Sequence, residues 1–368
     1  MRQSRNHGRA IGTGLAATAL CVVGMAGTTA GAQELNVFNW SDYIAEDTIE
    51  RFEEETGISV NYDVYDSNSV VEARLMAGAA GYDIVVPTAV PYFQRQVDAG
   101  IYQELDRDLI PNLDNLDASL MDRVDTQDYG VIYMWGTNGI GYNREAVLER
   151  MQDAPLTSLD LIFDPEVVAN FADCGVSMLD DAAEIIPMML NYLGHDPYGE
   201  DLDALQQAED RLMELREHVR YFHSSQYIND LANGEICLAI GWSGDVFQAR
   251  DRAAEAEQDF TIGYTIPEEG TVLWFDMMGI PADAPNPEAA HEFINFILQP
   301  EIIADITNYV VYANAVPASR DLMDPEISSD PSVFPPQEVQ DRLFSAQSVD
   351  PSYERARTRT WTRVRTGQ

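Results

Sequence analysis

The chain has 368 residues and a formal net charge of −40, because 62 acidic residues face 22 arginines and no lysine occurs. A surface of this charge repels nucleic acid and anionic lipid and attracts cations, so we expect no nucleic-acid partner. Acid-rich surfaces without lysine are also typical of proteins that stay hydrated at high salt, and the composition leaves this second explanation open.

Residues 1–32 have the features of a secretory signal peptide. They contain arginines but no acidic residue, an apolar stretch in the middle, and an A-x-A motif before Gln33. The apolar stretch is too short and too rich in small residues for a good membrane span. We therefore predict cleavage after this segment and a periplasmic location. A lipid anchor on Cys21 is disfavoured, because Leu20 and not a small residue precedes it.

Removal of the signal leaves Cys174 and Cys237 as the only cysteines. In an oxidising compartment an isolated pair is most simply one disulfide, although two buried free thiols are also compatible with the sequence. A bond between them would close a long loop and so restrict the unfolded chain.

The first mature segment has the pattern of a strand, a loop and a helix. The apolar run 35–38 predicts the strand, and residues 45–56 carry apolar side chains at helical spacing. The loop Asn39-Trp40-Ser41-Asp42-Tyr43 places an indole, a hydroxyl, a carboxylate and a phenol at the carboxyl end of a strand, where ligands bind in open α/β sheets. These groups suit an organic cation, because aromatic faces and carboxylates both attract ammonium.

The next segment alternates short apolar runs with amphipathic stretches. Residues 60–64 and 82–86 predict strands, and residues 68–78 and 92–100 predict helices. This order predicts a mainly parallel sheet covered by helices. Thr88 follows the second of these strands, and its hydroxyl is either a ligand contact or a helix N-cap.

Residues 134–143 are rich in glycine and aromatic residues. Their glycine spacing does not fit a dinucleotide-binding fingerprint, so we interpret the segment as a strand that crosses between two lobes. Residues 164–215 are predicted to be largely helical, with Asp181 and Glu184 in the first turn of one helix. Acidic residues at this position either complement the helix dipole or bind a ligand.

The pairing of a tryptophan with an aspartate recurs twice. One apolar strand leads into Trp242 and Asp245, and another leads into Trp274 and Asp276. A single Trp at a strand end is more often part of the core, and a single Asp after it is usually a helix cap. Three such units in one chain favour a shared cation site.

The remaining chain predicts strands at residues 260–266 and 272–280, the second returning to the first lobe, and a helix at residues 288–298. The C-terminus is rich in arginine. On so acidic a chain we interpret this cluster as a helix paired with the protein's own acidic surface. Its members are Arg355, Arg357, Arg359, Arg363 and Arg365.

Six segments match motifs of one known family: Asn39-Trp40-Ser41-Asp42-Tyr43-Ile44, Asp66-Ser67-Asn68, Leu75-Met76-Ala77-Gly78, Tyr221-Phe222-His223-Ser224-Ser225-Gln226-Tyr227-Ile228-Asn229-Asp230-Leu231, Gly241-Trp242-Ser243-Gly244-Asp245 and Tyr312-Ala313-Asn314-Ala315. Over essentially the whole mature chain, the sequence resembles the periplasmic polyamine-binding proteins, and most of all their putrescine-binding branch. The resemblance implies an α/β, two-lobe periplasmic binding fold of type II with the ligand in the cleft between lobes. It also implies a receptor that delivers polyamine to the membrane permease of an ABC importer.

We expect a monomer without cofactor or metal, in which residues 33–137 and 274–323 form lobe 1 and residues 138–273 and 324–368 form lobe 2. The family also has a disulfide where Cys174 and Cys237 stand. Its ligand contacts fall on stacking aromatics, phenols, carboxylates and hydroxyls. These are Trp40, Trp242, Trp274, Tyr43, Tyr312, Asp42, Glu184, Asp245, Asp276, Ser41, Thr88 and Ser224.

Two positions depart from the putrescine-binding branch. Trp274 replaces a smaller aromatic residue, and Asp181 places a carboxylate where that branch tends to have a small residue. Both resemble the spermidine-preferring branch. We therefore include Asp181 among the predicted ligand contacts and expect putrescine as first ligand and spermidine as second.

Two other classes of function are compatible with parts of the sequence. A receptor that senses polyamine for a membrane signalling partner would use the same binding chemistry. A glycoside hydrolase could use Asp245 and Asp276 as paired carboxylates beside aromatic platforms. However, residues 241–245 are one residue short of G-x-S-x-G and the usual hydrolase and nucleotide motifs do not occur, so we expect no enzyme.

Overall fold

The computed structural model describes residues 33–78 and 80–368. The predicted signal peptide, residues 1–32, and Cys21 within it lie outside the described residues. In the described part of the chain, no helix combines the length and the apolar character needed to cross a membrane.

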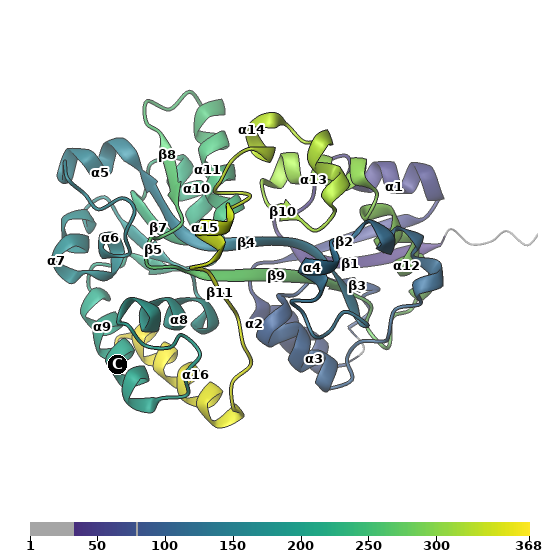
Figure 1. Cartoon of the computed structure of the whole chain (residues 1–368), viewed down its shortest axis with the longest axis horizontal. Coiled ribbons are helices and arrows are strands. Elements are labelled where there is room, and N and C mark those ends of the chain that lie inside the picture. Colours follow the sequence, from purple (N-terminus) through teal and green to yellow (C-terminus); the bar gives the residue numbers. More distant parts are fainter. Residues whose placement is uncertain (1–32, 79) are drawn as a thin grey trace, which may run out of the picture. The chain divides into compact units, whose positions relative to one another are not determined.

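The described residues form an eleven-stranded sheet whose main order is β2-β1-β3-β9-β4-β7-β5-β6, with helices packed on its faces (Figure 1). β8 and β10 pair with β4, and β11 pairs with β9. The strands are β1 (Glu34–Trp40), β2 (Ser59–Tyr65), β3 (Ile84–Val85), β4 (Gly130–Asn143), β5 (Val176–Met178), β6 (Tyr221–Phe222), β7 (Leu238–Trp242), β8 (Ile262–Thr265), β9 (Val272–Gly279), β10 (Ala313–Asn314) and β11 (Phe344–Ser345).

The first three strands are parallel, as the sequence predicts for this segment. Leu35 and Ile84 are fully buried, which explains the apolar runs of β1 and β3. The prediction of a mainly parallel sheet is wrong for the sheet as a whole. β9 pairs antiparallel with both β3 and β4, and β4 pairs antiparallel with β7, because the chain crosses the molecule along β4 and returns along β9.

β4 is the crossing strand that the sequence predicts. All of its 14 residues are buried. From Gly130 to Thr137 it pairs with β9, and from Asn138 onward it pairs with β7 and β8. A single strand thus supplies hydrogen bonds to both halves of the sheet, and the partner change between Thr137 and Asn138 marks the passage from one half to the other.

The helices cover the sheet; the first ends as predicted at Thr56, and the second ends at Met76, two residues before the predicted Gly78. Gly57, with a left-handed φ of 75°, ends the first helix, and the Ser67 side chain caps the second. The predicted helix 92–100 is divided between η1 and α3, so its regular part is short. The larger helices are α1 (Thr48–Thr56), α2 (Asn68–Met76), η1 (Ala89–Phe93), α3 (Gln94–Asp98), α5 (Arg144–Arg150), α8 (Ala182–Tyr192), α9 (Leu202–Leu215), α10 (Gln226–Ala232), α11 (Ser243–Glu255), α12 (Pro287–Ile297), α13 (Pro300–Val310) and α16 (Pro351–Thr366).

Short helical turns join these elements. They are η2 (Arg107–Leu109), η3 (Pro111–Asn115), α4 (Ala118–Met121), α6 (Asp160–Phe163), α7 (Pro165–Val168), η4 (Ala169–Phe171), η5 (Pro317–Leu322), α14 (Pro325–Ser328) and α15 (Gln337–Gln340).

Two connections fix the second half of the fold. Cys174 and Cys237 form a disulfide with a Cα–Cα distance of 5.5 Å, which confirms the predicted bond and ties the segment before β5 to the segment before β7. α16 packs beside α8 and α9 (Figure 1). Arg363 pairs with Glu209, and an Arg365 nitrogen lies 2.7 Å from Asp180 Oδ2. The C-terminal arginines therefore form a helix that pairs with the protein's own acidic surface, as predicted.

Candidate functional site

One cavity collects most of the predicted ligand residues. It has a volume of about 430 Å³, including the solvent at its mouth. Ten of its thirteen lining residues were predicted from the sequence, and they come from the ends of β1 and β7, from within β9, and from segments beside β3, β6 and β10. The lining residues are Trp40, Ser41, Tyr43, Asp66, Thr88, Ser224, Ser225, Ile228, Trp242, Asp245, Trp274, Asp276 and Tyr312.

Aromatic rings form the walls of this cavity. The ring centroids of Trp40 and Trp242 lie 5.5 Å apart in an edge-to-face arrangement, and those of Trp274 and Tyr312 lie 5.2 Å apart. The Trp40 indole N–H donates to the Val86 carbonyl at 2.8 Å, which fixes the orientation of its ring. Rings held in this way present π faces that attract cations and apolar surface that accepts methylene groups.

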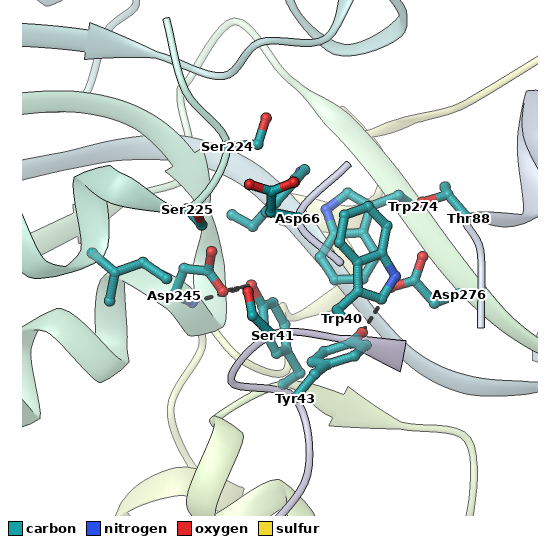
Figure 2. Close-up of a pocket in the computed structure, with 13 residues that line it drawn as sticks. Trp40, Ser41, Tyr43, Asp66, Thr88, Ser224, Ser225, Asp245, Trp274 and Asp276 are labelled. Atoms are coloured by element: carbon teal, nitrogen blue, oxygen red, sulfur yellow. Dashed lines mark hydrogen bonds between the residues drawn. The ribbon is translucent and has the colours of Figure 1, made fainter. Parts of the chain in front are cut away.

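Asp276 is the carboxylate on the Trp40 side of the cavity in Figure 2. It is 4% exposed, and the Tyr43 hydroxyl donates to its Oδ2 at 2.9 Å. Its Oδ1 is buried and has no hydrogen-bond partner among the described residues. Burial raises the pKa of Asp276 to about 7, because a carboxylate is less well solvated inside the protein than in water.

Asp245 lies on the other side of the cavity in the same view, at the start of α11 (Figure 2). The hydroxyls of Tyr227 and Tyr312 donate to its two oxygens at 2.7 and 2.6 Å. Burial raises the pKa of Asp245 to about 6, although both hydrogen bonds oppose this shift.

Neither Asp245 nor Asp276 takes part in an ion pair within the described residues. A buried charge without a partner is costly, so each carboxyl must hold a proton or meet a cation from outside the protein. The cavity therefore favours a ligand that carries positive charge at two separated points.

The structure places three predicted contacts outside this cavity. Asp42 adopts a left-handed φ of 55°, and its Oδ1 lies 2.7 Å from an Arg252 nitrogen at the surface. Asp181 and Glu184 are buried at the start of α8 without lining the cavity. These three assignments as ligand contacts remain predictions.

The Asp181 and Glu184 side chains are held by neighbours of the cavity. Asp181 caps α8 through the Ala183 N–H at 2.7 Å and accepts from the Tyr92 hydroxyl at 3.0 Å. Asn138 donates to Glu184. Burial raises the pKa of Asp181 to about 6, and burial together with the charge of Asp181 raises the pKa of Glu184 to about 8.

Three lining residues were not predicted as contacts: Asp66, Ser225 and Ile228. Asp66 directly follows β2 and precedes Ser67, the N-cap of α2. A carboxylate at the carboxyl end of a strand was the signal that could have identified it, since the same rule selected Asp245 and Asp276.

Comparisons with known proteins agree with this arrangement. Residues 47–335 match the family model described as bacterial extracellular solute-binding protein. The putrescine-binding periplasmic protein PotF of Escherichia coli (strain K12) is 46% identical over 362 residues, which cover 97% of this chain and 98% of the relative. The putrescine-binding periplasmic protein SpuD of Pseudomonas aeruginosa (strain UCBPP-PA14) is also 46% identical, over 95% of this chain and 98% of its own length.

A solved structure has the same architecture. A chain assigned to a spermidine/putrescine ABC transporter of Listeria monocytogenes superposes with a TM-score of 0.81 at 30% sequence identity. The match covers 91% of this chain and 100% of that one.

Proposed function

Because this chain belongs to the bacterial extracellular solute-binding protein family, we propose that it is an extracytoplasmic receptor for a polyamine, putrescine first and spermidine second, and that it delivers the ligand to the membrane permease of an ABC importer. The predicted two-lobe, type II periplasmic binding fold is confirmed by the family match and by the solved structural neighbour. The prediction that the chain is not an enzyme is also confirmed, since its relatives are binding proteins.

One observation carries the proposal: two buried carboxylates, Asp245 and Asp276, line one aromatic cavity, and no cation among residues 33–78 and 80–368 forms an ion pair with them. A diamine supplies an ammonium to each and covers the indoles of Trp40 and Trp274 with its methylene groups. A ligand with one charge would leave one carboxylate unpaired, and an anion would be repelled.

The predicted contacts that line the cavity form the proposed ligand set, with Asp66 added. Asp42, which pairs with Arg252 at the surface, is proposed as a contact at the mouth of the site. Asp181 and Glu184 are buried at the start of α8, and we propose them as the groups that a third ammonium would approach. This arrangement gives a physical reason why spermidine is the second ligand.

Lobe closure is the proposed mechanism, with lobe 1 formed by residues 33–137 and 274–323 and lobe 2 by residues 138–273 and 324–368. With these proposed lobe boundaries, at least two contacts join the lobes. The Tyr312 hydroxyl donates to Asp245 at 2.6 Å, and Asp42 pairs with Arg252. A diamine with one ammonium at Asp245 and the other at Asp276 would draw together carboxylates of both lobes and so favour the closed form, which the permease then recognises. We propose that the receptor acts as a periplasmic monomer.

Isothermal titration calorimetry tests the function. The protein is titrated at one fixed salt concentration with putrescine, cadaverine, spermidine and spermine, because unequal screening would distort the comparison. The diol with the carbon chain of putrescine is the matched uncharged control. We expect putrescine to bind most tightly, spermidine to follow within about 1–2 kcal/mol, and the diol not to bind. Absence of polyamine binding would refute the function, and spermidine binding a thousandfold weaker would refute the assigned roles of Trp274 and Asp181.

A further inference from the structure

The carboxylates of the cavity are the first members of a longer buried row. Asp245 and Asp276 line the cavity. Glu184 accepts a hydrogen bond from Asn138, which pairs with the cavity residue Trp242, and Asp181 is the N-cap of the same helix as Glu184. Neighbours along the row act on one another: the charge of Asp245 raises the pKa of Asp276, and the charges of Asp181 and Asp276 raise the pKa of Glu184. The row therefore extends the negative potential of the cavity toward α8 and α16.

Arg357 lies on the helix that packs against α8, at whose start Asp181 and Glu184 stand. It is on α16 and is 2% exposed, which is unusual for an arginine. One turn farther along α16, the Trp361 indole N–H donates to Asp180 Oδ1 at 3.0 Å, so this part of the helix packs directly against the start of α8. The positive charge of Arg357 lowers the pKa of both Asp181 and Glu184.

The Arg357 charge is only partly neutralised by other residues. One of its terminal nitrogens donates to Glu354, which is 27% exposed, and its Nε has no hydrogen-bond partner among the described residues. Arg95 also lies over the ring of Tyr92, but its charge is neutralised, because its guanidinium donates two hydrogen bonds of 2.7 Å to Glu72. Arg357 is thus the arginine whose charge remains available to the buried row.

We propose that Arg357 is a specificity-determining residue: it is a built-in cation at the Asp181 end of the carboxylate row, and it disfavours ligands whose third ammonium would reach that end. This inference rests on the proposed polyamine-binding function. A diamine meets Asp245 and Asp276 and leaves the Arg357 end undisturbed. A third ammonium placed beside Asp181 and Glu184 competes with the guanidinium for the same carboxylates and is repelled by it. Specificity often depends on such an unfavourable element built against the wrong ligand.

Substitutions on one helix test this proposal. Arg357→Met removes the charge and keeps much of the volume, whereas Arg357→Lys keeps the charge. Arg359→Met is the matched control, because Arg359 lies on the exposed face of α16 and its removal changes the net charge equally. Putrescine and spermidine are titrated into each protein at one mildly alkaline pH and one salt concentration, after folding is verified by circular dichroism.

Arg357→Met should raise the ratio of spermidine affinity to putrescine affinity by about tenfold, the effect of one partly buried charge pair. Arg357→Lys and Arg359→Met should leave the ratio near that of the wild type. If Arg357→Met does not fold, Glu354→Gln replaces it: loss of this carboxylate frees the guanidinium, and the ratio should fall. An unchanged affinity ratio in the folded variant would overturn the proposed role of Arg357 but not the proposed polyamine-binding function. A wild-type protein that binds no polyamine would overturn the proposed function as well.

Discussion

Asp245→Asn tests the charge requirement of the site most directly. Asp245 is 8% exposed and accepts hydrogen bonds from Tyr227 and Tyr312. The two hydroxyl oxygens also accept backbone N–H groups, from Trp242 at 3.0 Å and from Asp245 itself at 3.1 Å. An asparagine has nearly the same shape; its oxygen can accept from one hydroxyl while its NH2 donates to the other, so the variant should fold.

The substitution leaves one ligand ammonium without its carboxylate. A hydrogen bond to a charged group contributes about 2 kcal/mol, which corresponds to about thirtyfold in the dissociation constant. Stranding a buried charge adds to this cost, so thirtyfold is the smallest loss of putrescine affinity that we expect. The stability of the ligand-free protein should instead increase. Because burial raises the pKa of Asp245 to about 6, ionisation destabilises the ligand-free fold above that pH, and the neutral asparagine avoids this cost.

The assay is calorimetric titration of putrescine at neutral pH, with a thermal melt of each ligand-free protein. Asp251→Asn is the matched control, since Asp251 is on the same helix but exposed and paired with Arg250. It should change the affinity by less than about fivefold, the upper limit for an exposed ion pair. If folded Asp245→Asn binds putrescine as tightly as the wild type, Asp245 is not a ligand residue and the charge argument fails.

Three further predictions concern charge, pH and the disulfide. Asp42→Asn should weaken putrescine binding by less than about fivefold, because its partner Arg252 and the solvent already satisfy it; a larger loss by calorimetry would return Asp42 to the cavity. Putrescine affinity should fall as the pH is lowered from about 8 to about 5, since carboxyls with raised pKa values, about 7 for Asp276, then hold protons and cannot pair with ammonium. Binding at neutral pH should correspondingly release protons, seen as a binding enthalpy that varies with the buffer, and a pH-independent affinity would contradict this reasoning. Reduction of the bond between Cys174 and Cys237 should lower the free energy of unfolding by up to about 4 kcal/mol, and with it the melting temperature, and leave binding intact. Free thiols in the unreduced protein by mass spectrometry would contradict the disulfide.

The three tryptophan-aspartate units show how far the sequence could predict the site. Trp40 and Trp242 end β1 and β7, Trp274 lies within β9, and all three line one cavity. Strand periodicity predicts which residues stand at strand ends, and the sheet then places those ends together. The order of the strands was beyond this reasoning, because the pairing of β9 between β3 and β4 depends on contacts distant in the chain.

Asp42 shows where prediction from sequence stops. Its residue type and its place in the loop after Trp40 predict a ligand group, whereas the structure gives it a left-handed backbone and an ion pair with Arg252. Neither the dihedral angle nor an arginine 210 positions away can be read from the motif. Asp181 is a similar case, since its helix start was predicted but the hydroxyl of Tyr92 that holds it comes from another element.

The position of β9 also has a consequence for how the protein is made. β1, β2 and β3 are synthesised early, yet the strand that joins β3 to β4 is β9, residues 272–279. A nascent chain that lacks β9 has two incomplete sheets with open edges, and the pairings that complete them span long loops and form slowly. The N-terminal half is therefore expected to remain unfolded until most of the polypeptide has emerged from the ribosome. Such a delay would suit the proposed periplasmic role, in which the polypeptide crosses a membrane before it folds.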